Sequence, residues 1–157
     1  MKDILEVIWR LKKNGIQVMD CSNIIRECRM IKSPYEISCV KQAARIASAA
    51  FCALPIRMNQ LRREGVELTE RSVRKQMQML MLEYGADTMP YVMCQSGPGG
   101  YRNIVMEPSD HYLVEGDIVV IDTGAKFENY WCDFDRNFVI GKSLDHDSNT
   151  ARTHEVL

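Results

Sequence analysis

Two short stretches of helical apolar spacing open the chain. Residues 3–13 place apolar side chains at intervals of three and four, which predicts a helix ending at Asn14-Gly15. Residues 16–19 suggest a short strand, and Ser22 is placed to cap a second helix that ends near residue 32. This opening unit is too small to form its own core, so we expect residues 1–31 to be the end of a preceding domain or a linker.

Two longer helices are predicted next. Ser33, Pro34 and Glu36 combine an N-cap, a first-turn proline and a capping-box acid, so a long helix with a broad apolar face should follow. Pro55 is expected to kink or end it. Residues 69–84 predict another helix, and the methionine stripe along it is more typical of a core than of a binding surface.

The pattern then changes from helical spacing to strands. Residues 89–95, 116–125 and 130–141 are rich in β-branched and aromatic residues and are bounded by turn residues. The polar residues 126–129 suit a hairpin loop between the last two strands. Helices followed by antiparallel strands predict an α+β fold in which helices cover one face of the sheet.

This hairpin carries two aspartates. If its turn is centred on Phe127 and Glu128, Asp122 faces Asp133, and directly opposed like charges are destabilising. A bound cation would compensate them, as would a shared proton of the aspartic-protease kind. In a plainer alternative, Asp122 makes only a turn into Thr123-Gly124, and Asp133 and Asp135 lie on a solvated face.

A glycine-rich loop, SGPGGY at residues 96–101, precedes the hairpin. It lacks the Lys-Ser/Thr ending of a nucleotide P-loop, and no good helix pattern follows it. A plain turn, or a backbone approach to a substrate, is therefore favoured over a phosphate cradle.

Composition limits the classes of function. A net charge of −1 gives no electrostatic footprint for nucleic acid, and we expect no run of the roughly 18 apolar residues that a membrane span needs. The six cysteines contain no C-x-x-C pair, so we expect reduced thiols, mostly in the core, in a cytoplasmic protein.

Several short motifs occur in a fixed order: KSPYEI at 32–37, GVELTE at 65–70, SG at 96–97, GD at 116–117, IDTG at 121–124, and Tyr130 with DFDR at 133–136. In order and spacing they resemble the pita-bread metallopeptidases, which include prolidase, Xaa-Pro aminopeptidase, methionine aminopeptidase and creatinase. The resemblance runs from about residue 32 to 141. It implies a partial pita-bread fold, with residues 32–157 as the first half of the catalytic domain and residues 1–31 as the end of the N-terminal domain.

The resemblance also implies a metal site. Asp122 and Asp133 would be the first two ligands of a dinuclear centre of manganese, cobalt, zinc or iron, with Asp133 bridging both ions. Arg136 would contact the ligating carboxylates without binding the metal itself. Asp135, where Ser or Thr is more usual, would add a hydrogen-bond acceptor. Tyr130 matches a structural tyrosine. The implied reaction is hydrolysis of an amide near a peptide N-terminus, with a peptide or small amide as substrate.

The family's complete site also uses a His and two Glu from a second half of the fold. His146 and His154 come before the point where that half would begin. We therefore expect this chain alone to have little or no activity. The family's substrate-binding histidine has no counterpart here, because the corresponding residues 103–106 read NIVM and His111 lies too close to Gly116.

Two other functions stay open. The sequence VIDTGA at 120–125 is similar to that of an aspartic-protease half, but such a protomer would be almost entirely β, whereas residues before 89 are largely helical. The chain could instead be a non-catalytic half-domain or pseudo-enzyme. In that case two copies would pair as a homodimer and cover the open sheet edge.

Overall fold

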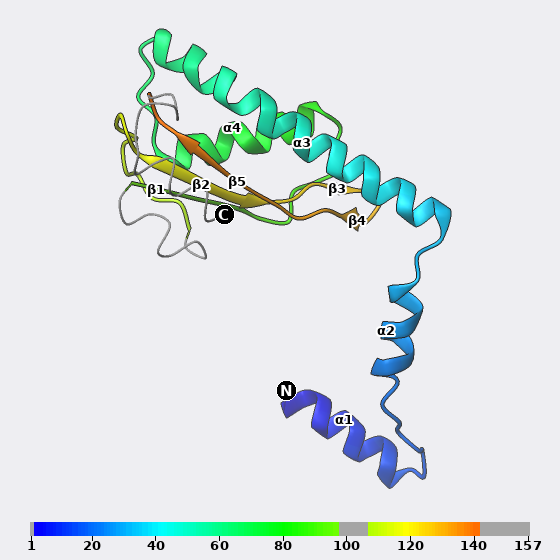
Figure 1. Cartoon of the computed structure of the whole chain (residues 1–157). Helices are drawn as coiled ribbons and strands as arrows, with labels where there is room; N and C mark the ends of the chain where they lie inside the picture. Colours follow the sequence, from blue (N-terminus) through cyan, green and yellow to red (C-terminus); the bar gives the residue numbers. More distant parts are fainter. Residues whose placement is uncertain (1, 98–106, 142–157) are drawn as a thin grey trace. The chain divides into compact units, whose positions relative to one another are not determined.

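The computed structural model describes residues 2–97 and 107–141. The chain folds as two compact units, residues 1–34 and residues 35–157, and each is described by itself. The elements are labelled in Figure 1.

The first unit contains two amphipathic helices, α1 (Lys2–Lys13) and α2 (Ser22–Met30). Both begin within a residue of their predicted starts. The prediction that Ser22 caps α2 is wrong, because Cys21 is the N-cap residue and no side chain caps this helix. The Asp20 carboxylate accepts a hydrogen bond from the Ser22 N–H at 2.8 Å. The strand predicted at residues 16–19 is wrong. A strand is stable only beside a partner, and residues 2–34 contain no strand with which it could pair.

The second unit begins with helix α3 (Pro34–Arg63), which starts at the predicted capping signal. Pro55 was expected to kink or end this helix, and it does not end it, because α3 continues through it. A proline inside a helix costs about 3 kcal/mol. Leu54 and Met58, on either side of it, are 0% and 4% exposed, so their burial in the core offsets that cost.

Helix α4 (Glu70–Glu83) begins where the sequence predicts. The Thr69 hydroxyl accepts from the Ser72 N–H at 3.1 Å, and the Ser72 hydroxyl accepts from the Thr69 N–H at 2.8 Å, forming a reciprocal capping box. Met77 and Met81 are fully buried, which confirms that the methionine stripe is core.

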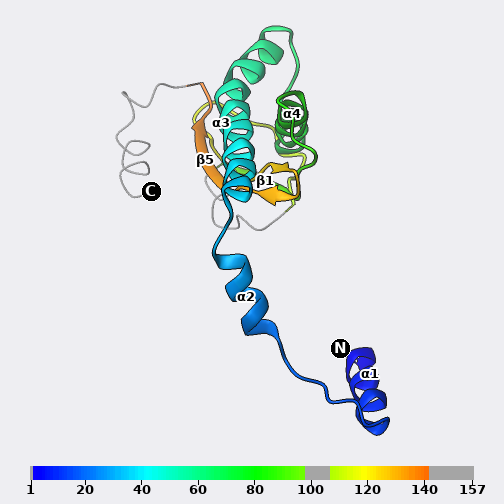
Figure 2. The same ribbon diagram turned by 90° about the vertical axis from the view of Figure 1, so that its right-hand side faces the viewer.

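The strands form a three-stranded antiparallel sheet in the order β1 (Val92–Ser96), β2 (Ile118–Thr123), β5 (Phe134–Val139). Strands β3 (Lys126–Phe127) and β4 (Tyr130–Trp131) pair separately at the hairpin tip. The helices lie on one face, as predicted: α3 stacks Phe51 on Phe134 and Phe138, and α4 packs on β1. Figure 2 shows α3 beside β5.

The core lies between the helices and this face of the sheet. By length and composition alone, helix α3 is long and apolar enough to cross a membrane, although no such run was expected from the sequence. A core helix meets the same criteria, and buried apolar residues of α3 such as Phe51 pack against the sheet. The main core residues are Ile46, Ala47, Ala50, Phe51, Leu54, Val73, Met77, Leu80, Met81, Val92, Cys94, Val119 and Ile121.

All six cysteines are free, in agreement with the prediction of reduced thiols. Cys39 and Cys94 are buried. The expectation that most cysteines fill the core is wrong for Cys21, Cys28 and Cys52, which are exposed.

A buried carboxylate joins three segments of the second unit. Glu70, 3% exposed, accepts hydrogen bonds from the N–H and hydroxyl of Ser96 at 2.7 and 2.8 Å, and from those of Ser109 at 2.9 and 2.7 Å. Burial raises the pKa of Glu70, but these four hydrogen bonds outweigh it and the net pKa is lowered. The start of α4, the end of β1 and the segment leading to β2 are thereby held together.

Replacing Glu70 with Gln is expected to lower the free energy of unfolding by about 3 kcal/mol, because an amide nitrogen would face backbone N–H donors that lose their acceptor. Urea denaturation measures this. Because the pKa of Glu70 is lowered on folding, its contribution is present at neutral pH and disappears as pH falls through the folded pKa, so the difference should shrink in acid. Glu67→Gln, at an exposed glutamate, is the control, and an equal loss in both variants would contradict the anchoring role.

Candidate metal centre

The hairpin turn sets the register of the carboxylates. Glu128 and Asn129 have φ of 50° and 68°, and Phe127 pairs with Tyr130 across the two-residue turn. Two consecutive left-handed residues match the twist of the flanking strands, and Asn tolerates that conformation well. The predicted turn at Phe127-Glu128 is therefore wrong by one residue, and the predicted strand register by two.

Asp122 consequently faces Asp135 and not Asp133. A shift of two residues keeps every side chain on its predicted face, because side chains alternate with a period of two. Asp133 thus lies diagonally across from Asp122. The structure brings all three aspartates to one face, although the predicted direct pairing of Asp122 with Asp133 does not occur.

Gly124 allows the strands to approach where the hairpin joins the sheet. A Cβ at this position would lie 1.8 Å from the carbonyl oxygen of Cys132, so only glycine fits. The Cys132 N–H donates to the Ala125 oxygen at 3.1 Å beside it. This close contact fixes the backbone from which Asp133 projects.

The sheet has two chemically different faces. Val119, Ile121 and Thr123 of β2 are fully buried toward the helices, together with Val92 and Cys94 of β1. The residues that alternate with them form the opposite face, here called the acidic face. It comprises Tyr91, Met93, Asp122, Asp133 and Asp135.

Tyr91 links the two predicted ligands. Its hydroxyl donates to Asp133 Oδ1 at 2.6 Å and lies 3.4 Å from Asp122 Oδ1. Burial raises the pKa of Tyr91, as do the two nearby carboxylates, so the phenol stays protonated as a donor. Sequence reasoning missed Tyr91, because it precedes β1 and reaches the aspartates only through the pairing of β1 with β2.

The carboxylates repel one another. Burial raises the pKa of Asp122, and the charges of Asp133 and Asp135 raise it further. Burial also raises the pKa of Asp135. Ionised carboxylate oxygens held close together favour a cation between them.

Arg136 lies on the other side of the sheet. Its guanidinium is 5.1 Å from the centre of the Phe134 ring, and Nη1 donates to the backbone oxygen of Asp135 at 2.6 Å. The structure therefore does not bring Arg136 to the side chains of Asp122 or Asp133. Tyr130 donates to Glu36 at 3.1 Å, which ties the hairpin to the start of α3.

The carboxylates fit part of a metal site. They are hard oxygen donors on one face, as divalent ions require. In residues 2–97 and 107–141, however, no group of three or more His, Cys, Asp or Glu side chains is arranged to hold an ion. His146, His154, residues 103–106 and the glycine-rich loop beyond Gly97 lie outside the described residues.

Known proteins are similar to this chain in sequence and in fold. The profile of metallopeptidase family M24 matches residues 38–157. A Xaa-Pro dipeptidase of Pyrococcus horikoshii is 30% identical over 132 residues, which cover 83% of this chain and 35% of that protein. A probable dipeptidase PepE of Mycobacterium bovis is 30% identical over 148 residues, covering 91% of this chain and 36% of the relative.

Solved structures of known proteins have a similar fold. The X-Pro aminopeptidase of Thermotoga maritima matches with a TM-score of 0.80 at 24% identity, covering 97% of this chain and 41% of that one, which shows the fold. The prolidase of P. horikoshii matches with a TM-score of 0.72 at 29% identity, covering 93% and 40%. The chain thus has a partial pita-bread fold and spans about a third of the length of the curated relatives it matches.

Replacing Gly124 with Ala is expected to lower the free energy of unfolding by roughly 3 kcal/mol, because the new methyl group would overlap the Cys132 carbonyl. Urea denaturation measures the loss. Gly65→Ala is the control, since Gly65 has φ +80° but open space around it, and should cost only about 1 kcal/mol. Equal losses would contradict the close approach, because Gly124, unlike Gly65, does not have a positive φ.

Replacing Asp122 with Asn is expected to stabilise the metal-free chain by about 0.5 kcal/mol at pH 7, because it removes a charge opposed to Asp135. A raised carboxyl pKa means that ionisation costs stability, so the gain should vanish as pH falls and the wild-type carboxyl becomes neutral. Thermal unfolding across pH 4 to 8 tests this. Asp110→Asn, which removes a carboxylate paired with Arg71, should bring no gain, and a destabilised Asp122→Asn would refute the repulsion.

Proposed function

Because the chain belongs to metallopeptidase family M24, we propose that it forms the first part of a metal-dependent hydrolase that cleaves an amide near a peptide N-terminus. The observation that carries this proposal is the placing of Asp122 and Asp133 on one face, joined by the Tyr91 hydroxyl. The relatives are described as Xaa-Pro dipeptidases and aminopeptidases, which supports a peptide or small amide as the substrate.

In this proposal Asp122 and Asp133 provide the first carboxylate ligands of a site for two divalent ions, of manganese, cobalt, zinc or iron. When bound, such ions supply an activated water and polarise the scissile carbonyl. Tyr91 would position one of these ligands. Its hydrogen bond orients Asp133 Oδ1 and leaves the other oxygen of that carboxylate available. Asp135, opposite Asp122, adds a further acceptor.

The catalytic site needs more ligands than the described residues bring together, so we propose that this chain alone is inactive or nearly so. Two carboxylates leave most coordination positions of two ions unfilled. The alternative is a non-catalytic half-domain that works in binding or assembly, which would also account for the shortage of ligands among the described residues. Strands β1 and β5 pair only with β2 among the described residues, and a second copy could cover either edge.

Isothermal titration calorimetry with Mn²⁺ and Co²⁺ tests the partial site. We expect weak binding to the wild-type chain and a loss of at least tenfold in affinity when Asp122→Asn and Asp133→Asn are combined, because each replacement removes an anionic ligand. Binding should also weaken as the pH falls, since burial and the nearby carboxylates raise the pKa of Asp122 and its protonation competes with the ion.

The matched control carries Asp3→Asn with Asp110→Asn, two exposed aspartates that are not among the residues of the acidic face. It should bind as the wild type does. No binding to a wild-type chain that circular dichroism shows to be folded would reject the partial metal site and favour the assembly role.

A further inference from the structure

A second concave site lies away from the acidic face, in the second unit. It is a pocket of about 390 Å³, within the usual range for small-ligand sites. Leu68 and Ile140, 4% and 6% exposed, lie at its floor. The residues that line it are Arg62, Gly65, Val66, Glu67, Leu68, Tyr112, Leu113, Val114 and Ile140.

This pocket is separate from the proposed metal site. Ile140 follows the end of β5, where Val139 pairs with Ile118 at the start of β2. Asp122 lies four residues further along β2, about 13 Å away at the rise of an extended strand. A ligand bound in this pocket would therefore not occupy the proposed metal site.

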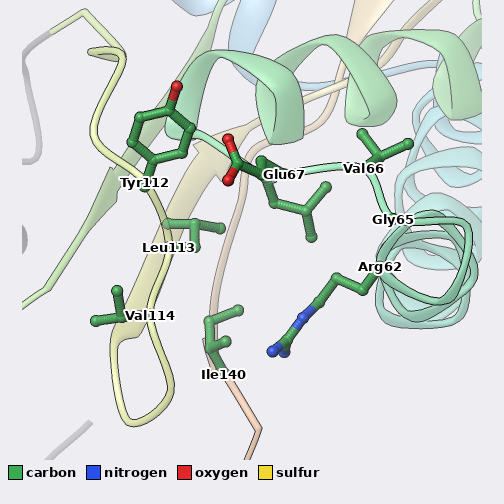
Figure 3. A pocket seen from close by; sticks show the side chains of 9 residues that line it. Arg62, Gly65, Val66, Glu67, Tyr112, Leu113, Val114 and Ile140 are labelled. Carbon is green, nitrogen blue, oxygen red and sulfur yellow. The ribbon is translucent and has the colours of Figure 1, made fainter.

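Arg62 provides an unpaired positive charge. Figure 3 shows its side chain extending from the last turn of α3 toward Ile140. No hydrogen bond or ion pair joins its guanidinium to any residue in the described part of the chain. Arg62 is exposed to solvent, and its planar guanidinium suits a carboxylate that can accept two hydrogen bonds.

Glu67 provides an unpaired negative charge in the same pocket. Its carboxylate lies on the Tyr112 side in Figure 3, and it has no ion pair with Arg62 or with any other described residue. The pocket lining thus contains two opposite charges that do not pair with each other, together with apolar side chains that include Leu68 and Leu113.

From this arrangement we propose that the pocket binds a short peptide with free ends and apolar side chains. Its carboxylate pairs with Arg62, its ammonium group pairs with Glu67, and its side chains cover Leu68, Leu113 and Ile140. A free zwitterion satisfies both charges at once, whereas a lone anion or cation leaves one of them unpaired. Binding is non-covalent and requires no metal, so it stands independently of the proposed hydrolase function.

The test is an NMR titration of the whole chain in the presence of EDTA, with the dipeptide Leu-Leu as the probe. We expect millimolar affinity and shifts concentrated on the amides of residues 65–68 and 112–114, because few groups are engaged and the pocket is open to solvent. N-acetyl-Leu-Leu and Leu-Leu-amide, each with one charge removed, should bind about fivefold more weakly.

Arg62→Gln should weaken Leu-Leu about fivefold and abolish its advantage over Leu-Leu-amide, while Glu67→Gln should abolish its advantage over N-acetyl-Leu-Leu. Arg63→Gln is the matched control, because Arg63 is adjacent in sequence but does not line the pocket. Equal binding of the three probes, equal effects of Arg62→Gln and Arg63→Gln, or no shifts at these amides would each overturn the proposal. EDTA separates this result from a failure of the metal site.

Discussion

The period of two along β2 is the constraint on which the rest of the second unit depends. One set of its side chains must fill the core beneath α3 and α4, so the alternating set has to point the other way. Asp122 belongs to that second set, between the buried Ile121 and Thr123. A register slip of one residue would move Asp135 to the core side and expose Phe134, so burial of the aromatic residues holds the acidic face in place.

The same constraint concentrates like charges. With Asp122 opposite Asp135 and Asp133 diagonal to it, burial and mutual repulsion act together on a few carboxylates, and the Tyr91 hydrogen bond compensates only in part. Local rules of sheet pairing disfavour such an arrangement. In the proposed function, a bound cation would offset this repulsion.

Local signals in the sequence predicted local structure well. The caps at Ser33-Pro34 and Thr69 gave the starts of α3 and α4, because those signals act within one turn of a helix. The strand register depends instead on left-handed conformations at Glu128 and Asn129, which the composition of the loop does not specify. Tyr91 and the four hydrogen bonds of Glu70 join residues more than twenty positions apart, and spacing along the chain carries no trace of them.

The buried Glu70 carboxylate also helps to order the pocket that Arg62 and Glu67 line. Glu70 holds Ser109, and from there the chain runs alongside residues 68–70: the Leu113 N–H donates to the Leu68 oxygen at 2.9 Å, and Tyr112 pairs with Thr69. Leu68, Tyr112 and Leu113 all line the pocket, so its wall is built from a segment fixed by backbone pairing and a buried carboxylate. A wall that is already ordered costs little conformational entropy when a ligand binds. We therefore expect the ordered wall to favour binding of the proposed ligand, whose charges would pair with Arg62 and Glu67.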